Sequence, residues 1–392
     1  MQQIRIDELV ARHARSLSAR LQAHREQIFP PNAQKEMRRF TSGEAAKLLG
    51  VNDAYLRKLH LDGRGPEPEI GSGGRRSYST ENIRRLRELL EAGAKSPGQY
   101  LPGRREGNHL QVITVINFKG GSAKTTTAAH LAQKSALDGY RVLAIDLDPQ
   151  ASLSALHGIQ PEFDLKDGGT LYDAIRYEDP LPLSDVIQQT YVAGLDLVPG
   201  NLDLMEFEHD TPRILAQRGA SSMPFFTRIG EALTLVEADY DIVVIDCPPQ
   251  LGFLTMAALS SATAVLITIH PQMLDMMSMC QFLLMTAELL GVVAQAGGNM
   301  RYDWLRYLVT RYEPGDGPQS QMVGFMRNLF GEYVLANEVL KSTAISDAGI
   351  TKQTLYEVEK GNFTRSTYER AIESLNAVNA EIEVLIQQAW GR

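Results

Sequence analysis

Short apolar runs alternate with longer amphipathic segments from residue 111 to the end of the chain. Such runs, each of strand length and nearly continuous in apolar character, are typical of a parallel sheet covered by helices on both faces. They are QVITVINF (111–118), YRVLAIDLD (140–148), DLVPG (196–200), YDIVVIDCP (240–248), AVLITIH (264–270) and LRYLVTRY (305–312). We therefore expect a doubly wound α/β domain over residues 111–392.

The first apolar pattern of the chain is helical. Apolar residues between positions 4 and 28 recur at helical spacing, and Pro30-Pro31 follows. Proline cannot continue a helix, so we expect the helix to end there. A lone amphipathic helix needs a cover for its apolar stripe, either its own domain or a second copy. We favour pairing and assign residues 1–35 to a dimerisation helix.

The pattern of residues 36–93 predicts short helices and a hairpin. Thr41 and Glu44 form a capping box before a first helix, and a turn at Gly50 leads to a second helix over 53–60. Two short strands around Gly73-Gly74 precede a third helix, which Ser79 or Thr80 caps. Helix, turn, helix and hairpin in this order predict a winged helix-turn-helix. A helical hairpin that binds protein is the alternative.

This segment resembles the winged helix-turn-helix of MerR-like regulators, which also carries R-x-Y-S before a helix. The resemblance implies DNA binding, with the second helix in the major groove and the wing on phosphates. The expected DNA-binding residues are Tyr55, Arg57, Lys58, Arg75 and Arg76. Residues 94–110 are rich in Gly, Pro and basic side chains and are expected to form a linker.

Charge and cysteine content narrow the class of protein. The net charge is −8, yet basic side chains outnumber acidic ones over residues 1–110, which favours a polyanion partner for that part. Cys247 and Cys280 are too few for a disulfide framework, and we expect both to be buried small hydrophobes. No apolar run of about 18 residues predicts a membrane span. We expect a cytoplasmic protein.

The stretch VINFKGGSAKTTTAAHLA (115–132) carries the candidate chemistry. It follows a predicted strand and opens a predicted helix, where backbone N–H groups bind phosphate. Gly120-Gly121 permits close approach, Lys124 can reach the β- and γ-phosphates, and the Thr125 hydroxyl can ligate Mg²⁺. Ala123 occupies a usual glycine position, and we expect an ordinary right-handed conformation there. Phe118 and Ala123 break the standard phosphate-loop pattern.

The loop K-G-G-x-x-K-T resembles the deviant Walker A motif of the ParA/MinD class of ATPases. In that class the early lysine, here Lys119, reaches the nucleotide of the other subunit in a dimer. The resemblance also implies that Asp148 positions the attacking water and that Asp246 holds the water shell of Mg²⁺. ATP or ADP would contact Lys119, Gly120, Gly121, Ser122, Ala123, Lys124, Thr125, Thr126, Thr310 and Arg311. The catalytic set would be Lys119, Lys124 and Asp148.

The combination of this ATPase pattern with a DNA-binding segment is similar to the large plasmid-partition ATPases, and most like the RepA partition proteins of repABC-type plasmids. The resemblance implies a homodimer on the nucleoid that binds DNA without sequence preference and responds to a ParB- or RepB-like centromere-binding partner. It also implies autorepression through a specific operator. A nucleotide-responsive repressor without a segregation role is the alternative.

Two other members of the class fit less well. A MinD-like membrane ATPase would end in a basic amphipathic helix, whereas the last predicted helix, residues 367–388, is acidic. We therefore expect no membrane partner. A nitrogenase-reductase-like protein would need cysteines that hold a cluster, and neither cysteine has such a setting.

Overall fold

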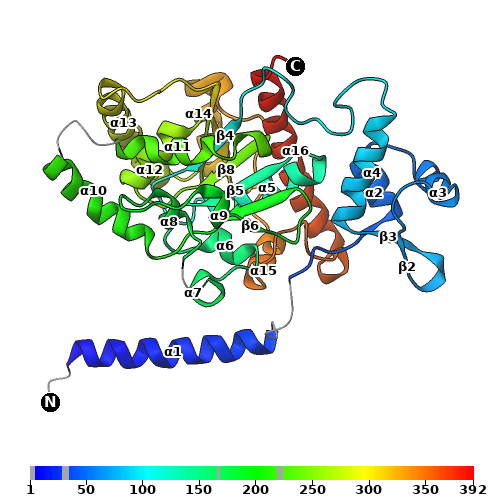
Figure 1. The fold of residues 1–392 in the computed structure, drawn as a ribbon, viewed down its shortest axis with the longest axis horizontal. Coiled ribbons are helices and arrows are strands. Elements are labelled where there is room, and N and C mark those ends of the chain that lie inside the picture. The colour runs from blue at the N-terminus through cyan, green and yellow to red at the C-terminus, as the bar shows by residue number, and fades with distance from the viewer. Residues whose placement is uncertain (1–4, 29–34, 166–167, 219–223) are drawn as a thin grey trace. The chain divides into compact units, whose positions relative to one another are not determined.

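The computed structural model describes residues 5–28, 35–165, 168–218 and 224–392. The chain forms two compact units, residues 1–36 and 37–392. The first contains helix α1 (Ile6–Ile28), which confirms the predicted helix (Figure 1). Its apolar side chains Ile6, Val10 and Leu17 are exposed. Pro30 and Pro31, expected to end this helix, lie outside the described residues.

The second unit is built on a seven-stranded sheet with the order β10-β9-β4-β8-β5-β7-β6. Its strands are β4 (Gln111–Ile116), β5 (Val142–Asp146), β6 (Gln188–Gln189), β7 (Leu195–Val198), β8 (Ile242–Asp246), β9 (Ala264–Ile269) and β10 (Trp304–Val309). All neighbours pair in parallel except β6 with β7. The six predicted strands and the mostly parallel α/β sheet are confirmed, and β6 is an edge strand that the pattern did not predict.

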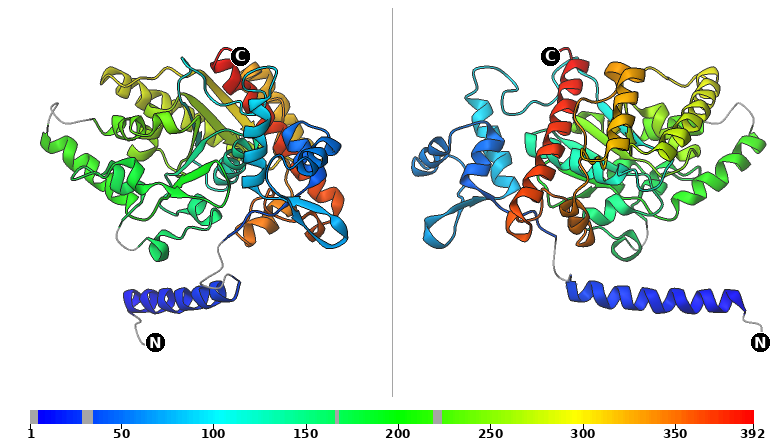
Figure 2. Two further views of the ribbon diagram at one scale, coloured as in Figure 1. Left: turned by 45° about the vertical axis from the view of Figure 1, so that its right-hand side comes forward. Right: turned by 180° about the vertical axis from the view of Figure 1, so that it is seen from behind.

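Helices cover both faces of this sheet (Figures 1 and 2). On one face Ile113 and Val115 of β4 join a hydrophobic core with α5 and α16, and on the other Val112 and Ile116 join a core with α11 to α14. The alternation of a buried strand therefore supplies both cores. The helices are α5 (Lys124–Asp138), α6 (Ser152–Leu156), α7 (Pro161–Asp164), α8 (Leu171–Ile175), α9 (Leu183–Val186), α10 (Leu204–Arg218), α11 (Arg228–Thr234), α12 (Phe253–Ser261), α13 (Met273–Gln295), α14 (Gly317–Phe330), α15 (Thr343–Ile350) and α16 (Arg365–Ala389).

Residues 37–93 form three helices and a small sheet. The elements are β1 (Phe40–Thr41), α2 (Ser42–Leu49), α3 (Asp53–Leu61), β2 (Glu69–Ile70), β3 (Arg76–Tyr78) and α4 (Thr80–Ala92), with the strand order β1-β3-β2. Thr41 and Glu44 form the expected capping box, and Gly50 ends α2 with a φ of 64°. Ser79 caps α4. Gly73 and Gly74 both have a φ of 73° at the tip between β2 and β3.

The core of residues 37–93 is continuous with the core beneath α5. Buried Arg87 of α4 joins them, because its guanidinium donates hydrogen bonds to Leu48 O of α2 (2.7 Å), Leu137 O of α5 (3.0 Å) and Tyr100 O (3.0 Å). Tyr100 lies in segment 94–110, whose backbone also donates to the Glu91 carboxylate. Residues 37–392 form one compact unit. The division of this unit into domains 36–93 and 111–392, joined by a linker, remains a prediction.

Two expectations about α13 are wrong. Cys280 lies exposed on this helix, whereas Cys247 is buried as expected. Among the described residues α13 is also a helix long and apolar enough to cross a membrane by length and composition, contrary to the absence of such a run expected above. Met279, Phe282 and Val293 pack from α13 into the core of the sheet. We therefore interpret α13 as a covering helix of the α/β unit.

Candidate functional site

The phosphate loop joins the carboxyl end of β4 to the amino end of α5. Asn117, directly after β4, fixes the loop, because its Oδ1 accepts a hydrogen bond from Lys119 N (3.0 Å) and its Nδ2 donates to Thr268 O of β9 (2.5 Å). Gly121 has a φ of 78°, a conformation that glycine adopts without strain. The backbone N–H groups at the start of α5 are thus available to an anion at the end of the sheet.

Ala123 has a left-handed conformation, with φ 64° and ψ 29°. The expected right-handed conformation is wrong at this position. An N-cap residue is ordinarily extended, as Asn52 is at the start of α3. The left-handed conformation of Ala123 therefore follows from the path of the phosphate loop into α5 and not from the N-cap position itself. A left-handed alanine carries a steric cost of about 1–2 kcal/mol that glycine avoids.

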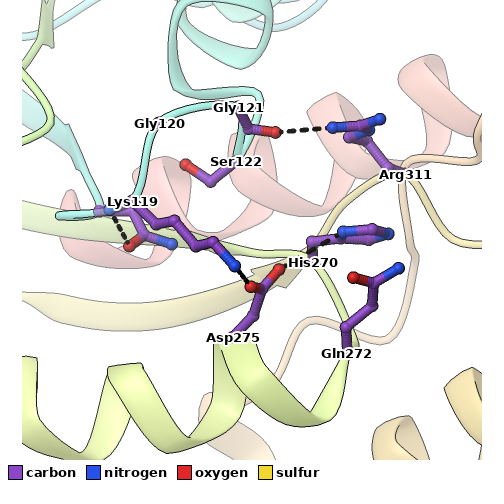
Figure 3. Close-up of a pocket in the computed structure, with 9 residues that line it drawn as sticks. Lys119, Gly120, Gly121, Ser122, His270, Gln272, Asp275 and Arg311 are labelled. Atoms are coloured by element: carbon purple, nitrogen blue, oxygen red, sulfur yellow. Dashed lines mark hydrogen bonds and ion pairs between the residues drawn. The ribbon is translucent and has the colours of Figure 1, made fainter.

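The two lysines of the loop have different surroundings. Lys124 is buried, with 7% of its surface exposed, and its Nζ lies 3.4 Å from Lys119 O. Burial lowers the pKa of Lys124, and the negative charge of Asp246 opposes this shift. The Lys119 side chain is 42% exposed and forms an ion pair with Asp275 at the start of α13 (Figure 3). One lysine therefore points into its own site, and the other lies at the surface.

Two carboxylates meet beneath the loop. Asp146 of β5 and Asp246 of β8 are partners in the parallel register, and both are completely buried. Burial raises the pKa of Asp146 to about 7, although Ser154 N and Oγ both donate to its Oδ2 (2.7 Å). Burial, and then the charge of Asp146, raise the pKa of Asp246 well above its usual value.

A magnesium ion bound with phosphates fits these groups. The Thr125 hydroxyl and the Lys124 ammonium lower the pKa of Asp246 against its burial, so hydroxyl, ammonium and carboxylate lie together. A buried carboxylate with a raised pKa is stabilised by a cation. Mg²⁺ takes few protein carboxylates and completes its shell with phosphate and water. In keeping with this, the described residues contain no cluster of three or more His, Cys, Asp or Glu side chains that would hold a metal unaided.

Asp148 lies two residues beyond β5, at the edge of the same site. Its backbone N donates to Asp146 Oδ1 (3.2 Å), and its own Oδ1 accepts from Gln150 N (2.9 Å). The side chain is partly exposed, unlike the two carboxylates beneath the loop. Asp148 is therefore accessible to a group that approaches the site from outside.

Thr310 and Arg311 contact the loop and follow β10. The Thr310 hydroxyl is buried and donates to Ser122 O (3.0 Å), and Arg311 Nη1 donates to Gly121 O (3.1 Å). These bonds hold the loop, and a contact of either residue with a base stays a prediction. A cavity of about 300 Å³ lies beside them, and its lining is Asn117, Lys119, Gly120, Gly121, Ser122, His270, Gln272, Asp275 and Arg311 (Figure 3).

Sequence reasoning missed four of these lining residues, namely Asn117, His270, Gln272 and Asp275. Asn117 carried a local signal, since it stands between the strand and the two lysines. The other three come from the end of β9 and the start of α13. They reach the loop only because β9 pairs with β4.

The side chains expected to bind DNA belong to α3 and to the hairpin of β2 and β3, both within residues 37–93. Tyr55, Arg57 and Lys58 are exposed on α3. Leu56 and Leu59 on the same helix are buried. Arg75 is exposed beside the tip between β2 and β3, whereas Arg76 is half-buried and pairs with Ile70 in the hairpin register.

Comparisons with known proteins give both family and fold. The family described as "AAA domain" matches residues 110–292. A protein described as "Putative replication protein A" in Sinorhizobium fredii is 56% identical over 394 residues, which cover 100% of this chain and 96% of that protein. Protein SopA of Escherichia coli (strain K12) is 30% identical over 333 residues, 83% of this chain and 82% of SopA.

Two solved structures are also similar. Cobyrinic acid a,c-diamide synthase from Mycobacterium smegmatis, with bound ADP and magnesium, has a TM-score of 0.51 and 27% identity, and the match covers 62% of this chain and 91% of that one. A structure titled "Partition Protein" has a TM-score of 0.61 over 97% of this chain and 99% of its own, at 19% identity. The latter likeness concerns the fold alone.

Proposed function

The chain belongs to the ParA family of plasmid-partition ATPases, and we propose that it hydrolyses ATP as a dimer in which each protomer completes the site of the other. The proposal rests on one observation. The same loop carries a buried lysine directed into its own site and a half-exposed lysine at the surface. The first suits a nucleotide bound in cis, and the second suits a nucleotide bound by a second copy.

The cofactors are ATP or ADP with Mg²⁺. The phosphates bind the loop 119–126, with Lys124 as the cation of the protomer's own site. Thr125 would ligate Mg²⁺ and Asp246 would hold the water shell of the ion, which would supply positive charge to neutralise the phosphates. Asp148 orients the attacking water. Lys119 of the second copy offsets the charge that develops on the transferred phosphoryl group, as an arginine finger does in other ATPases.

The surface of α13 supports pairing next to the loop. Six of its large apolar side chains are exposed, namely Met273, Leu274, Met277, Leu284, Met285 and Val292. The helix begins at Met273, two residues before Asp275, the ion-pair partner of Lys119. Exposed apolar patches mark interaction sites. A second copy placed against the loops would cover the first turns of α13.

We further propose that residues 36–93 are a winged helix-turn-helix. In α3 the buried residues are Leu56 and Leu59. Tyr55, Arg57 and Lys58 are exposed on the same helix, as a groove-binding helix requires. Arg75 beside the hairpin tip suits a phosphate contact. Through this part the protein binds its operator and represses its own operon. The ATP-bound dimer binds DNA without sequence preference on the nucleoid and responds to a ParB-like partner.

Sedimentation velocity tests the central part of this proposal. Wild-type protein with Mg²⁺ and a non-hydrolysable ATP analogue is expected to form a dimer beyond any pairing it shows without nucleotide. Lys124→Ala is the control, since it removes the cation of the protomer's own site and is expected to abolish the analogue-induced change. An analogue-loaded wild type with unchanged mass at every concentration would contradict the proposal.

A further inference from the structure

Lys119 is bound by an acidic side chain of its own chain. Lys119 belongs to the loop after β4, and the carboxylate that pairs with its ammonium belongs to Asp275 in the first turn of α13 (Figure 3). The exposed fraction of the side chain is 42% for Lys119 and 9% for Asp275. The carboxylate is therefore the fixed member of the pair, and the lysine is the member that is free to leave.

The backbone of Lys119 is anchored while its side chain is not. Lys119 N donates to Asn117 Oδ1 (3.0 Å), and Lys119 O accepts from Lys124 Nζ (3.4 Å). A change of side-chain rotamer is thus sufficient to move the ammonium away from Asp275. Because these hydrogen bonds hold the backbone of Lys119, we expect the phosphate loop to keep its conformation during such a move.

Another ionisable group beside the Asp275 carboxylate is His270, which is a weaker partner for it than Lys119. His270 Nδ1 lies 3.4 Å from Asp275 Oδ2. Burial, and then the charges of Arg311 and Lys119, lower the pKa of His270, which disfavours the charged form of the ring. Without Lys119, the nearly buried Asp275 carboxylate would lose its ammonium partner and would depend on the His270 ring and the amino end of α13 to offset its charge. Removing Lys119 from Asp275 therefore has a free-energy cost.

We propose that Asp275 is a positioning residue that holds Lys119 within its own protomer and opposes pairing until a nucleotide competes for the ammonium. One ammonium cannot pair with a carboxylate in cis and reach a triphosphate in trans. The two states exclude each other, and the ion pair sets a threshold for dimer formation. This inference rests on the proposed function, because it takes the nucleotide of a second copy as the alternative partner of Lys119.

The variant Asp275→Asn tests the inference. It keeps the size of the side chain and removes the charge that holds Lys119. In sedimentation velocity with Mg²⁺ and a non-hydrolysable ATP analogue, the dimer dissociation constant is expected to fall about tenfold, as befits an ion pair with one buried partner. Glu288→Gln is the control, because Glu288 is exposed on the same helix and the chemical change is the same. Asp275→Glu keeps the charge and is expected to restore weaker pairing.

The direction of the effect separates this role from a structural one. Loss of a stabilising acidic residue at the start of α13 would leave pairing unchanged or weaken it. A dissociation constant for Asp275→Asn equal to or above the wild-type value would therefore overturn the inference. If wild-type protein fails to pair with the analogue at all, the proposed function fails instead, and labelling of Lys119 still tests the ion pair.

Amine labelling followed by mass spectrometry needs only nucleotide-free protein. In the wild type Lys119 is expected to react several-fold more slowly than Lys47, which is exposed on α2. In Asp275→Asn the Lys119 rate is expected to rise toward that of Lys47, with no change in Glu288→Gln. Equal rates for Lys119 and Lys47 in the wild type would overturn the inference, even if Asp275→Asn did not fold.

Discussion

Asp146 and Asp246 lie opposite each other at the ends of β5 and β8, completely buried and in register. Ionising both carboxylates is costly even with the Lys124 ammonium nearby, because burial and the charge of Asp146 raise the pKa of Asp246. The nucleotide-free chain thus carries a destabilising arrangement that bound Mg²⁺ would relieve. The pair is a structural reason for metal-dependent nucleotide binding.

Asp246→Asn is expected to act in opposite directions on stability and binding. The free energy of unfolding of the nucleotide-free protein should rise at pH 8 by about 1–2 kcal/mol, because one buried charge is gone. The stabilisation by ATP that depends on Mg²⁺ should be lost. Thermal unfolding with and without Mg²⁺ and ATP measures both effects.

Asp196→Asn is the control for this experiment. Burial also raises the pKa of Asp196, so the same chemical change is made to a second carboxylate with a raised pKa. Asp196 lies on β7, and its carboxylate accepts a hydrogen bond from the Tyr240 hydroxyl. This variant should keep the full Mg²⁺-dependent stabilisation. An Asp246→Asn protein that kept it as well would refute the assignment of Asp246 to the metal.

His130 links the phosphate-loop helix to the C-terminal part of the chain. Its Nδ1 is 2.6 Å from Thr126 O, and its Nε2 accepts a hydrogen bond from Leu355 N (3.1 Å), so the buried ring is neutral. Burial lowers the pKa of His130 to about 4. The unfolded chain therefore binds more protons than the folded one between about pH 4 and pH 6.5, and His130 makes stability rise with pH over that window.

Comparison of His130→Gln with wild type isolates this contribution. Other groups titrate in the same window, Asp146 among them, so the difference between the two proteins is the useful quantity. The stability difference between pH 4 and pH 7 should be smaller in the variant by up to about 3 kcal/mol. Urea unfolding at a series of pH values measures it, and parallel curves for the two proteins would contradict the prediction.

Ala123→Gly is expected to stabilise the nucleotide-free protein by about 0.5–1 kcal/mol. Glycine avoids the steric cost of about 1–2 kcal/mol at this left-handed position, and its larger loss of backbone entropy on folding offsets part of that gain. Ala128→Gly is the control. Ala128 lies within α5, where glycine should destabilise by about 1 kcal/mol or more. Thermal unfolding of both variants checks the signs, and a loss of stability in Ala123→Gly would show that the alanine methyl group makes a contact that outweighs the strain.

Arg75→Ala is expected to weaken operator binding and to lower the slope of log affinity against log salt by about 1, since one phosphate contact is removed. Arg213→Ala on α10 is the control and should leave the slope unchanged. Fluorescence anisotropy over a range of salt concentrations measures the slope. An unchanged slope in Arg75→Ala would place the hairpin tip outside the interface with DNA.

The strands and the loop were predictable because local physics determines them. Each central strand is buried on both faces and therefore reads as a continuous apolar run, whereas Gln188–Gln189 is a two-residue edge strand with no such constraint. The pattern of residue types in the phosphate loop was sufficient to single out Lys119 and Lys124 as its candidate cations. The conformation of Ala123 was not predictable, because closure of the loop onto α5 determines it rather than any preference of alanine.

The residues that contact the phosphate loop from other elements are brought there by tertiary structure. Asp275 is separated from Lys119 by more than one hundred residues, and the pairing of β9 with β4 brings them together. Cys280 shows the same limit, since the apolar run around it predicts burial on every side. Only the packing of α13 on one face of the sheet leaves Cys280 exposed.

Mixing two inactive variants tests most directly whether Lys119 acts on the nucleotide of a second copy. Lys119→Ala alone is expected to lose partner-stimulated turnover by ~10³ or more, and Asp148→Ala should bind ATP without hydrolysing it. In a mixed dimer the Lys119→Ala protomer keeps its own Asp148 and receives Lys119 from the other protomer. One of the two sites of the mixed dimer is therefore complete. An equal mixture should therefore recover up to about one quarter of wild-type turnover, if pairing is random and each complete site works at its normal rate. A mixture as inactive as its components, although mixed dimers form, would show that Lys119 acts within its own protomer and would contradict the account.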